Sequence, residues 1–475
     1  MKRIILVLLT IMLTLASCSV GFESDGSDNS VSDILSDDMN SSDMISADTS
    51  FNSESGDITS ENDDSENLDV TSEFDNSSSD DNDESNGDDE AVNNYTYFKG
   101  VWLTQFDLYD VYLENGNQRD KDSFAALMKN IFLKLKDDGY NSVIVQVRPY
   151  ADSYYPSEYY PVSNYVSGAF GREDIYDPIE ILVPLARECG LEFHAWLNPM
   201  RGMKVSEIQN VPDGYPIKKW YNDVELRNKY LSVLNDRIYL NPAHEEVRSL
   251  IANGAAEVVS RYDVDGVHID DYFYPTTDVS FDDVSFNDYR SNGGALSLDE
   301  YRRYNLDLMV SLMYTAIKNA NPDAVFGISP AGNIDNTYKL MYADVYKWCS
   351  EIGYLDYICP QIYFGLEHST HDFKKIYDVW ASIVKQDSIK LYVGMTLGKA
   401  VSGVDNYAGN GKFEWRDNKD VLKRCIEFLN EQEDCRGIAM FCYQHMYNPL
   451  TGESVSDTFE ERNNLKNSLI MLGSD

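Results

Sequence analysis

Eight short runs rich in β-branched and aromatic residues recur between residues 95 and 475, and amphipathic stretches with helical spacing separate them. Such alternation is typical of parallel α/β folds, because each helix carries the chain back to begin the next strand. Eight strand–helix units predict a (β/α)8 TIM barrel, with residues 95–475 as one domain. The eight runs occupy residues 98–106, 142–149, 191–199, 265–273, 324–333, 355–364, 389–398 and 436–444.

Four of the intervening stretches have the apolar spacing of amphipathic helices, and they span residues 123–139, 177–190, 245–262 and 297–320. A doubly wound open sheet alternates in the same way, but it commonly carries a Gly-rich phosphate loop after its first strand. No such loop follows residues 98–106, so we favour the barrel. Residues 461–472 have the pattern of a helix that closes it.

The first 18 residues have the layout of an export signal: a basic start, the apolar run IILVLLTIMLTL, and small residues before Cys18. The apolar run is too short for a comfortable membrane span. The tetrapeptide LASC resembles the lipobox of bacterial lipoproteins, in which the cysteine is lipidated and becomes the new N-terminus. We therefore expect residues 1–18 to be a lipoprotein signal peptide and Cys18 to anchor the exported chain to the membrane, facing the cell wall or the exterior. An ordinary signal peptide with an incidental cysteine is the alternative.

Residues 19–94 differ in composition from the rest of the chain, since they contain 24 Asp or Glu and no Lys, Arg or His. Low hydrophobicity with a high like charge leaves too little burial to offset the entropy of folding, so we expect a disordered acidic tether. The formal net charge of −41 also includes an acidic folded part. This acidity argues against nucleic acid as a partner and against direct adhesion to an anionic bilayer.

The run DGVHIDDYF ends in two adjacent aspartates, Asp270 and Asp271. In a (β/α)8 barrel the active site lies at the C-terminal ends of the strands, and successive side chains alternate between the lumen and the helix layer. Val267 and Ile269 suit the helix-facing side. We therefore expect His268 and Asp270 to face the lumen, with Asp271 just beyond them at the rim.

The same alternation on the other strands gathers polar and aromatic side chains at the same end of the barrel. The candidate substrate-binding residues are Trp102, Gln146, Arg148, His194, Trp196, Asn198, His268, Tyr272, Asn333, Gln361, Tyr363 and Tyr443. Some of them could instead be hydrogen-bonded fillers of the barrel interior. As a set they suit sugar rings, because Trp and Tyr offer flat apolar faces with polar edges.

Carboxylates at this mouth suit glycoside hydrolysis, which needs a pair of carboxyl groups flanking the scissile bond, one of them able to donate a proton. The chain has no G-x-S-x-G elbow and no H-E-x-x-H motif, so serine-hydrolase and metalloprotease chemistry lack their signatures. Carbohydrate is therefore the expected substrate class. The sequence does not choose between retention and inversion of configuration.

Five ordered motifs, FKGVWLTQFD, QVRPYADSYYPSEYYP, FHAWLNPMR, YLNPAHEEVR and DGVHIDDYFYP, together resemble the glycoside-hydrolase-like family 10. The resemblance covers residues 97–447. It implies a barrel distantly similar to α-amylase-type enzymes, often in a bacterial lipoprotein. It also implies a glycosidase, since some members of the family act on peptidoglycan glycan strands, particularly those whose stem peptides have been removed.

The segment DGVHID also resembles the D-G-x-R-x-D pattern on the fourth strand of α-amylase relatives, and it matches at Asp265, Gly266 and Asp270. The resemblance implies that Asp270 stands at the nucleophile position. His268 replaces the arginine of that pattern. The group that would orient the nucleophile is therefore different.

The proton donor is not assigned by this resemblance, because the fifth run ends in ISPAGN where the amylase pattern has a glutamate. Asp271 is the first candidate, since it is adjacent to Asp270 and lies within the motif. Glu367, after the sixth run, and Asp335, after the fifth, are the alternatives. Asp271 could also be a loop carboxylate that binds backbone amides or positions Arg148.

Three functions stay open on the sequence alone. The first is hydrolysis of cell-wall glycan strands, the second is a non-catalytic surface lipoprotein that binds glycan, and the third is hydrolysis of another extracellular polysaccharide such as an α-glucan. We expect a monomer without a cofactor. The many loop carboxylates would permit a structural calcium ion, but they do not predict one.

Overall fold

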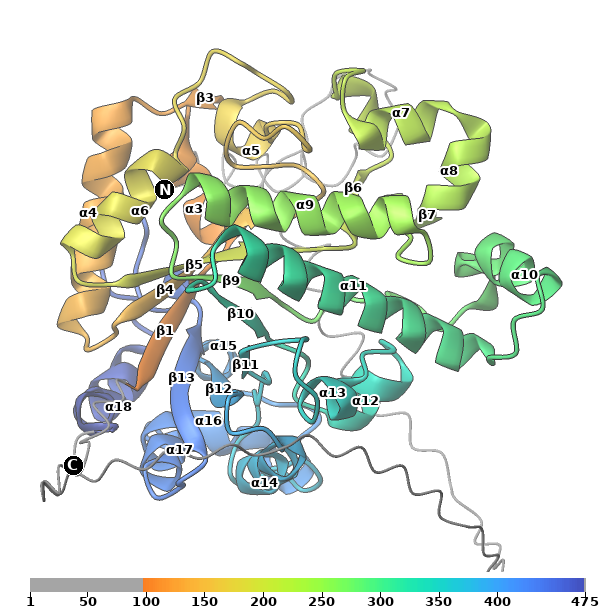
Figure 1. The fold of residues 1–475 in the computed structure, drawn as a ribbon. Coiled ribbons are helices and arrows are strands. Elements are labelled where there is room, and N and C mark those ends of the chain that lie inside the picture. The colour runs from red at the N-terminus through yellow and green to blue at the C-terminus, as the bar shows by residue number, and fades with distance from the viewer. Residues whose placement is uncertain (1–96, 474–475) are drawn as a thin grey trace, which may run out of the picture. The chain divides into compact units, whose positions relative to one another are not determined.

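The computed structural model describes residues 97–473, which contain a closed barrel of eight parallel strands (Figure 1). Barrel strands that are consecutive in the sequence are hydrogen-bonded neighbours, and the last barrel strand pairs with the first. In chain order they are β1 (Phe98–Leu103), β4 (Ser142–Arg148), β5 (Glu192–Leu197), β9 (Gly266–Ile269), β10 (Val325–Ile328), β11 (Tyr357–Ile358), β12 (Lys390–Thr396) and β13 (Cys435–Phe441). The predicted (β/α)8 barrel is confirmed.

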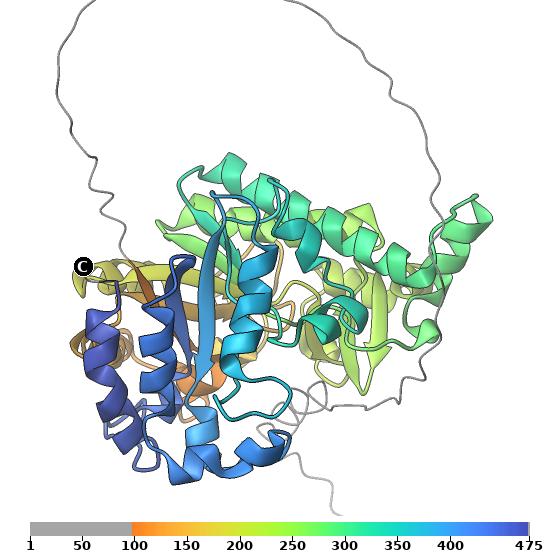
Figure 2. The same ribbon diagram turned by 90° about the horizontal axis from the view of Figure 1, so that it is seen from below.

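Helices cover the outside of the barrel. The four predicted helical stretches correspond to α4 (Lys121–Asp137), α6 (Ile179–Glu188), α9 (Glu245–Arg261) and α11 (Leu298–Ala320). The later strands are followed by the short α12 (Ile334–Lys339) and α13 (Val345–Trp348), then by α14 (Phe373–Ile383), α17 (Val421–Leu429) and the closing helix α18 (Phe459–Met471). Figure 2 shows the blue C-terminal helices packed outside the blue strands.

Local signals explain where the longest helix begins. Ser297 caps α11, since its hydroxyl accepts from the Glu300 amide while the Glu300 carboxylate accepts from the Ser297 amide. This reciprocal capping box satisfies two amides that the first turn leaves unpaired. Helix α11 packs beside α9 across one side of the barrel (Figure 1).

An insertion between β5 and α9 forms a small antiparallel sheet that the sequence did not predict. Its strands are β6 (Arg201–Lys204), β7 (Leu231–Leu234) and β8 (Arg237–Leu240) in the order β6-β8-β7, and the helices α7 (Pro216–Asn222) and α8 (Val224–Tyr230) lie between β6 and β7. The Ser232 hydroxyl donates to the Phe281 carbonyl at 2.6 Å. The sheet therefore contacts the long loop that follows β9.

Several sequence predictions fall on residues 1–96, outside the described part of the chain, and they stay predictions. They are the signal peptide (1–18), the lipid on Cys18 and the disordered acidic tether (19–94). Within residues 97–473, no helix is long and apolar enough to cross a membrane. The six cysteines of this part are unpaired and buried.

Candidate active site

Asp270 directly follows strand β9 at the carboxyl end of the barrel, and only 3% of its surface is exposed. Asn198 Nδ2 lies 2.7 Å from each carboxylate oxygen, Trp196 Nε1 donates to Oδ2 at 3.1 Å, and the Tyr272 amide donates to Oδ1 at 3.3 Å. These donors hold the carboxylate in one orientation. The structure thus brings four predicted site residues together.

Hydrogen bonds from Gln105 and Gln146 decide which end of the Asn198 amide points at Asp270. The Gln105 amide donates to Gln146 Oε1 at 2.9 Å, and Gln146 Nε2 donates to Asn198 Oδ1 at 2.7 Å. Because the Asn198 oxygen is engaged as an acceptor, its NH2 group must point at Asp270. Gln146 is therefore a positioning residue for this site.

Burial raises the pKa of Asp270, and the negative charge of Asp271 raises it further, whereas the hydrogen bond from Asn198 lowers it. Burial also raises the pKa of Asp271, which is half-buried, against a hydrogen bond from Gln361 that lowers it. Two interacting carboxyl groups release their protons in successive steps. The pair can therefore keep one proton at a pH where isolated aspartates have lost theirs.

Arg201, at the start of β6, is the cation of the site and is not among the residues predicted from the sequence. Its guanidinium carbon lies 4.2 Å from the centre of the Tyr272 ring and 4.9 Å from that of Tyr150. Its charge lowers the pKa of both Asp270 and Asp271. The signal was present, since Arg201 is the last residue of the motif FHAWLNPMR.

Gln361 and Tyr363 form the rim on the side of β11, and both are half-buried. Gln361 Nε2 donates to the Ser329 carbonyl at 3.0 Å. Burial raises the pKa of the Tyr363 phenol well above its usual range, and the charges of Asp270 and Asp271 raise it further. Tyr363 therefore lies within electrostatic reach of the aspartate pair.

The structure places His194, His268 and Trp102 below the mouth, inside the barrel. His194 lies opposite Gly266, the first residue of β9, and is 2% exposed. Trp102 Nε1 donates to His268 Nε2 at 3.2 Å, and the Tyr357 hydroxyl lies 2.9 Å from His268 Nδ1 and 3.1 Å from His194 Nδ1. We therefore regard these three predicted substrate-binding residues as interior fillers.

Arg148 is also displaced from the predicted mouth, and a bulge in β4 is the reason. Gln146 pairs with Trp196, but Arg148 pairs with Leu197, so Val147 is an extra residue. One extra residue turns every later side chain to the other face of the strand.

The guanidinium of Arg148 consequently lies in the helix layer, 4.5 Å over the Tyr160 ring. It lies against Gly254 of α9, where a Cβ would meet Nη1 at 2.2 Å. Any side chain larger than hydrogen at Gly254 would therefore displace Arg148.

Four other predicted residues lie apart from the aspartate pair. Asn333 caps α12 and contacts His371 Nε2 at 3.0 Å, and Tyr443 is fully buried with its ring 5.8 Å from that of Tyr447. Glu367 is exposed, in a loop whose amides Glu414 binds. Asp335 is exposed and forms an ion pair with Lys339 at 2.8 Å. None of these contacts supports a role in proton transfer.

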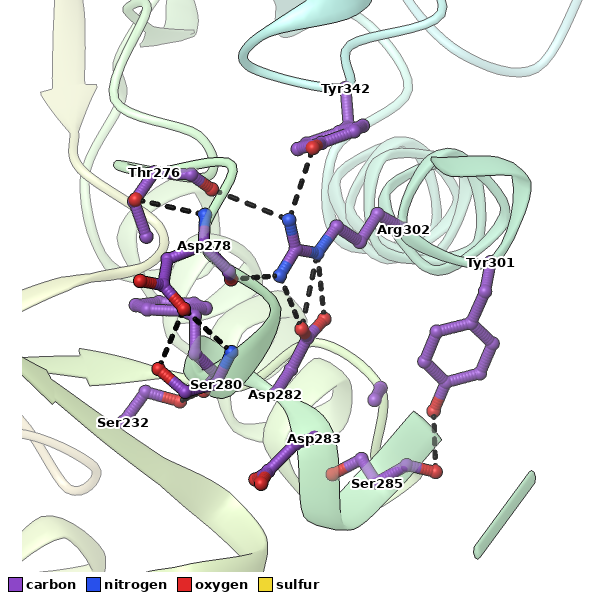
Figure 3. A network of polar contacts seen from close by, with 12 residues as sticks. Ser232, Thr276, Asp278, Ser280, Asp282, Asp283, Ser285, Tyr301, Arg302 and Tyr342 are labelled. Atoms are coloured by element: carbon purple, nitrogen blue, oxygen red, sulfur yellow. Dashed lines mark hydrogen bonds and ion pairs between the residues drawn. The ribbon is translucent and has the colours of Figure 1, made fainter. Parts of the chain in front are cut away.

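A buried ion pair fixes the far end of the loop that carries the two aspartates. Figure 3 shows Arg302 of α11 pointing at Asp282, the Asp278 carbonyl and the Tyr342 hydroxyl. The side chains of Arg302 and Asp282 are fully buried, with Nη2 and Oδ1 2.5 Å apart. Losing one partner would leave a buried charge uncompensated, which typically costs about 3–5 kcal/mol.

Within residues 97–473, no group of three or more His, Cys, Asp or Glu side chains is arranged to hold a metal ion. The residues described above supply two acids, an arginine, side-chain amides and aromatic rings. That set can donate a proton to a leaving oxygen and can stabilise positive charge beside it.

Comparison with known proteins identifies the family. The family described as "Glycosyl hydrolase-like 10" matches residues 97–408. Glycosyl hydrolase YngK of Bacillus subtilis is 33% identical over 328 residues, which cover 64% of this chain and 61% of YngK. Glycosyl hydrolase DigH of Escherichia coli K12 is 30% identical over 390 residues, which cover 75% of this chain and 85% of DigH.

A solved structure supports the fold. The PgaB (BpsB) glycoside hydrolase domain from Bordetella bronchiseptica aligns with a TM-score of 0.50 and 12% identity, covering 78% of this chain and 99% of that domain. The resemblance drawn from the five sequence motifs is confirmed, and with it, at the level of the family, the prediction of a glycosidase. The chain belongs to the glycosyl hydrolase-like 10 family.

Proposed function

We propose that this protein is an exported, lipid-anchored glycoside hydrolase that cleaves cell-wall glycan strands, namely peptidoglycan without stem peptides. Asp271 acts as the general acid, and Asp270 stabilises the positive charge that develops at the anomeric carbon. The observation that carries the proposal is the pair of adjacent acids, one clamped by Asn198 and Trp196 and the other half-buried. A protonated carboxyl group beside a carboxylate is what glycoside hydrolysis requires.

The surroundings of the pair support a sugar as the ligand. Tyr272 and Tyr363 are half-buried beside the aspartates, so each can offer one ring face to a pyranose. Trp102 and Trp196, which are 2% and 5% exposed, support the floor of the site and do not offer stacking faces. Peptidoglycan is the substrate that the family resemblance favours, and the acidic tether and lipid anchor predicted from the sequence would hold the barrel near the wall.

A glycan panel tests the proposal with the full-length protein. Release of reducing ends is measured on peptidoglycan strands freed of stem peptides, on intact peptidoglycan and on a starch-like glucan. We expect release from the freed strands above all. Preferential release from the glucan would overturn the choice of substrate, and retention of freed strands in a pull-down without release would identify a binding protein.

A further inference from the structure

We infer that the nucleophile in this site is the 2-acetamido group of the substrate sugar, and that neither aspartate forms a bond to the anomeric carbon. The inference rests on the proposed function and deepens it, because it restricts the substrate to β-linked 2-acetamido sugars. Three observations carry it: Asp270 is already fully engaged, Asp270 and Asp271 come from one strand end, and other acids of the barrel are committed elsewhere.

Asp270 has little capacity left for attack. A carboxylate offers about four lone-pair sites. Asn198 contacts both oxygens, Trp196 contacts one and the Tyr272 amide contacts the other, while only 3% of the residue is exposed. Attack on a sugar carbon would require Asp270 to leave these donors unpaired in a buried site, which is costly. A fixed, buried carboxylate is better suited to stabilising a nearby positive charge.

The two acids also approach a bound sugar from the same wall. Asp270 and Asp271 are consecutive, so their Cα atoms lie about 3.8 Å apart across the peptide bond. A retaining enzyme with a protein nucleophile places its two carboxyl groups on either side of the scissile bond, about 5–5.5 Å apart. Two acids at one strand end can protonate the leaving oxygen and stabilise charge, but the attacking atom must come from elsewhere.

Three further acids of the described chain, Asp107, Asp335 and Glu367, are ill placed for this role. Asp107 is 2% exposed, and its oxygens accept from the backbone amides of Thr104 and Gln444. Asp335 is paired with Lys339, and Glu367 is an exposed loop residue. The substrate itself is thus the source of the nucleophile that fits the described residues.

The chemistry balances with the groups present. In the first step the acetamido oxygen bonds to C1 as the bond from C1 to the departing oxygen breaks, and that oxygen takes the proton of Asp271. The positive charge then lies on a bicyclic oxazolinium ion, and the carboxylate of Asp270 compensates it. In the second step Asp271 takes a proton from water, the water oxygen bonds to C1, and the acetamido group is restored. Each step inverts C1, so the product keeps the β configuration.

The test uses wild-type protein and freed peptidoglycan strands, so it does not depend on a variant that could fail to fold. Proton NMR of the first-formed reducing end should show the β anomer. A matched pair of strands then carries either N-acetyl or N-trifluoroacetyl groups. Fluorine withdraws electrons from the attacking oxygen, so turnover should fall on the order of 100-fold, given how much rate an intramolecular nucleophile supplies.

The possible failures are distinguishable. A first-formed α anomer, or equal turnover of the two strands, would overturn the inference and leave the proposed function standing. No release from any strand together with release from a starch-like glucan would overturn the proposed function, and the inference with it.

Discussion

Two polar layers lie one above the other inside this barrel, and they differ in how their hydrogen bonds are balanced. The lower layer consists of His194, Tyr357, His268 and Trp102. The upper layer consists of Asp270, Asn198, Trp196 and Gln146, with Asp271 at its rim. Both layers are built from lumen-facing residues at similar strand positions, and both are almost completely buried apart from the rim.

The lower layer has one consistent assignment of protons. Trp102 Nε1 can only donate, so His268 Nε2 accepts, and burial lowers the pKa of His268 well below its usual range. The single proton of His268 is then on Nδ1 and is donated to the Tyr357 oxygen, whose own proton goes to His194 Nδ1. Within these three contacts each donor has one acceptor.

The upper layer has no such single assignment of protons, because it contains two interacting carboxyl groups, either of which can hold a proton. Burial raises the pKa of both aspartates, and Arg201 opposes that rise for both. A polar interior residue is therefore structural where donors and acceptors match one to one. It is a candidate for catalysis where its pKa is shifted so that both its protonated and its ionised forms can occur at the working pH.

The largest effect should come from removing the proton donor of the upper layer. We expect Asp271→Asn to reduce release of reducing ends from freed strands by roughly 10²–10⁴-fold, the usual contribution of general acid–base catalysis. Circular dichroism checks that the fold is unchanged. Asp174→Asn, which removes an exposed acid paired with Arg172, is the matched control and should retain activity. Wild-type turnover by Asp271→Asn would contradict the assignment.

A smaller effect should follow from weakening the clamp on Asp270. Asn198→Leu removes the hydrogen bond that lowers the pKa of Asp270, so this pKa should rise and the acidic limb of the pH–rate profile should move to higher pH. A hydrogen bond to a charged group contributes about 1.5–3 kcal/mol, so activity at neutral pH should fall roughly 10–100-fold. An unchanged acidic limb of the pH–rate profile would show that activity does not depend on the negative charge of Asp270.

The lower layer should respond in stability instead of turnover. Tyr357→Phe leaves a donor on His268 and an acceptor on His194 unpaired, so the free energy of unfolding should fall by about 1–3 kcal/mol. Urea denaturation measures this loss, with Tyr304→Phe at the surface as control. Activity per folded molecule should change far less than in Asp271→Asn. A larger loss of turnover than of stability would mean that the two layers are not separate.

The smallest effect concerns pH and stability. The folded pKa of Asp271 is raised, so the folded state binds its proton more tightly than the unfolded state does. Wild-type stability should therefore fall as pH rises from below the unfolded pKa through the folded pKa. Asp271→Asn lacks this loss, so it should be more stable than wild type at neutral pH and equal to it near pH 3. A constant difference at both pH values would count against a raised pKa.

Much of the fold was predictable, because the spacing of apolar residues and the alternation of side chains along a strand are local properties of a sequence. The alternation in DGVHIDDYF correctly placed His268 and Asp270 in the lumen. The depth of each side chain along the barrel axis was not predictable, since it depends on how the tilted strands are staggered against one another. His194 and Asp270 therefore appeared equivalent in sequence, although they lie in different layers.

The errors at the site have similar physical causes. The position of Arg148 depends on one bulge, and no local pattern in SVIVQVRP signals it. Arg201 acts from a four-residue strand within an insertion, which is too short for its period to be read. The position of Glu367 depends on a contact distant in sequence, since its amide donates to Glu414, 47 residues away.

Strand β4 contains one residue more than its neighbour β5, namely Val147. This bulge keeps the guanidinium of Arg148 out of the barrel mouth, where Arg201 already lies. If Val147 paired with Leu197 in a regular ladder, Arg148 would fall one position further along and would face the lumen instead of α9. Two arginines would hold both acids as carboxylates, and neither could release a proton to a departing alcohol. Straightening this one bulge, with every residue kept, would thus silence the barrel while leaving its ladder of strands intact.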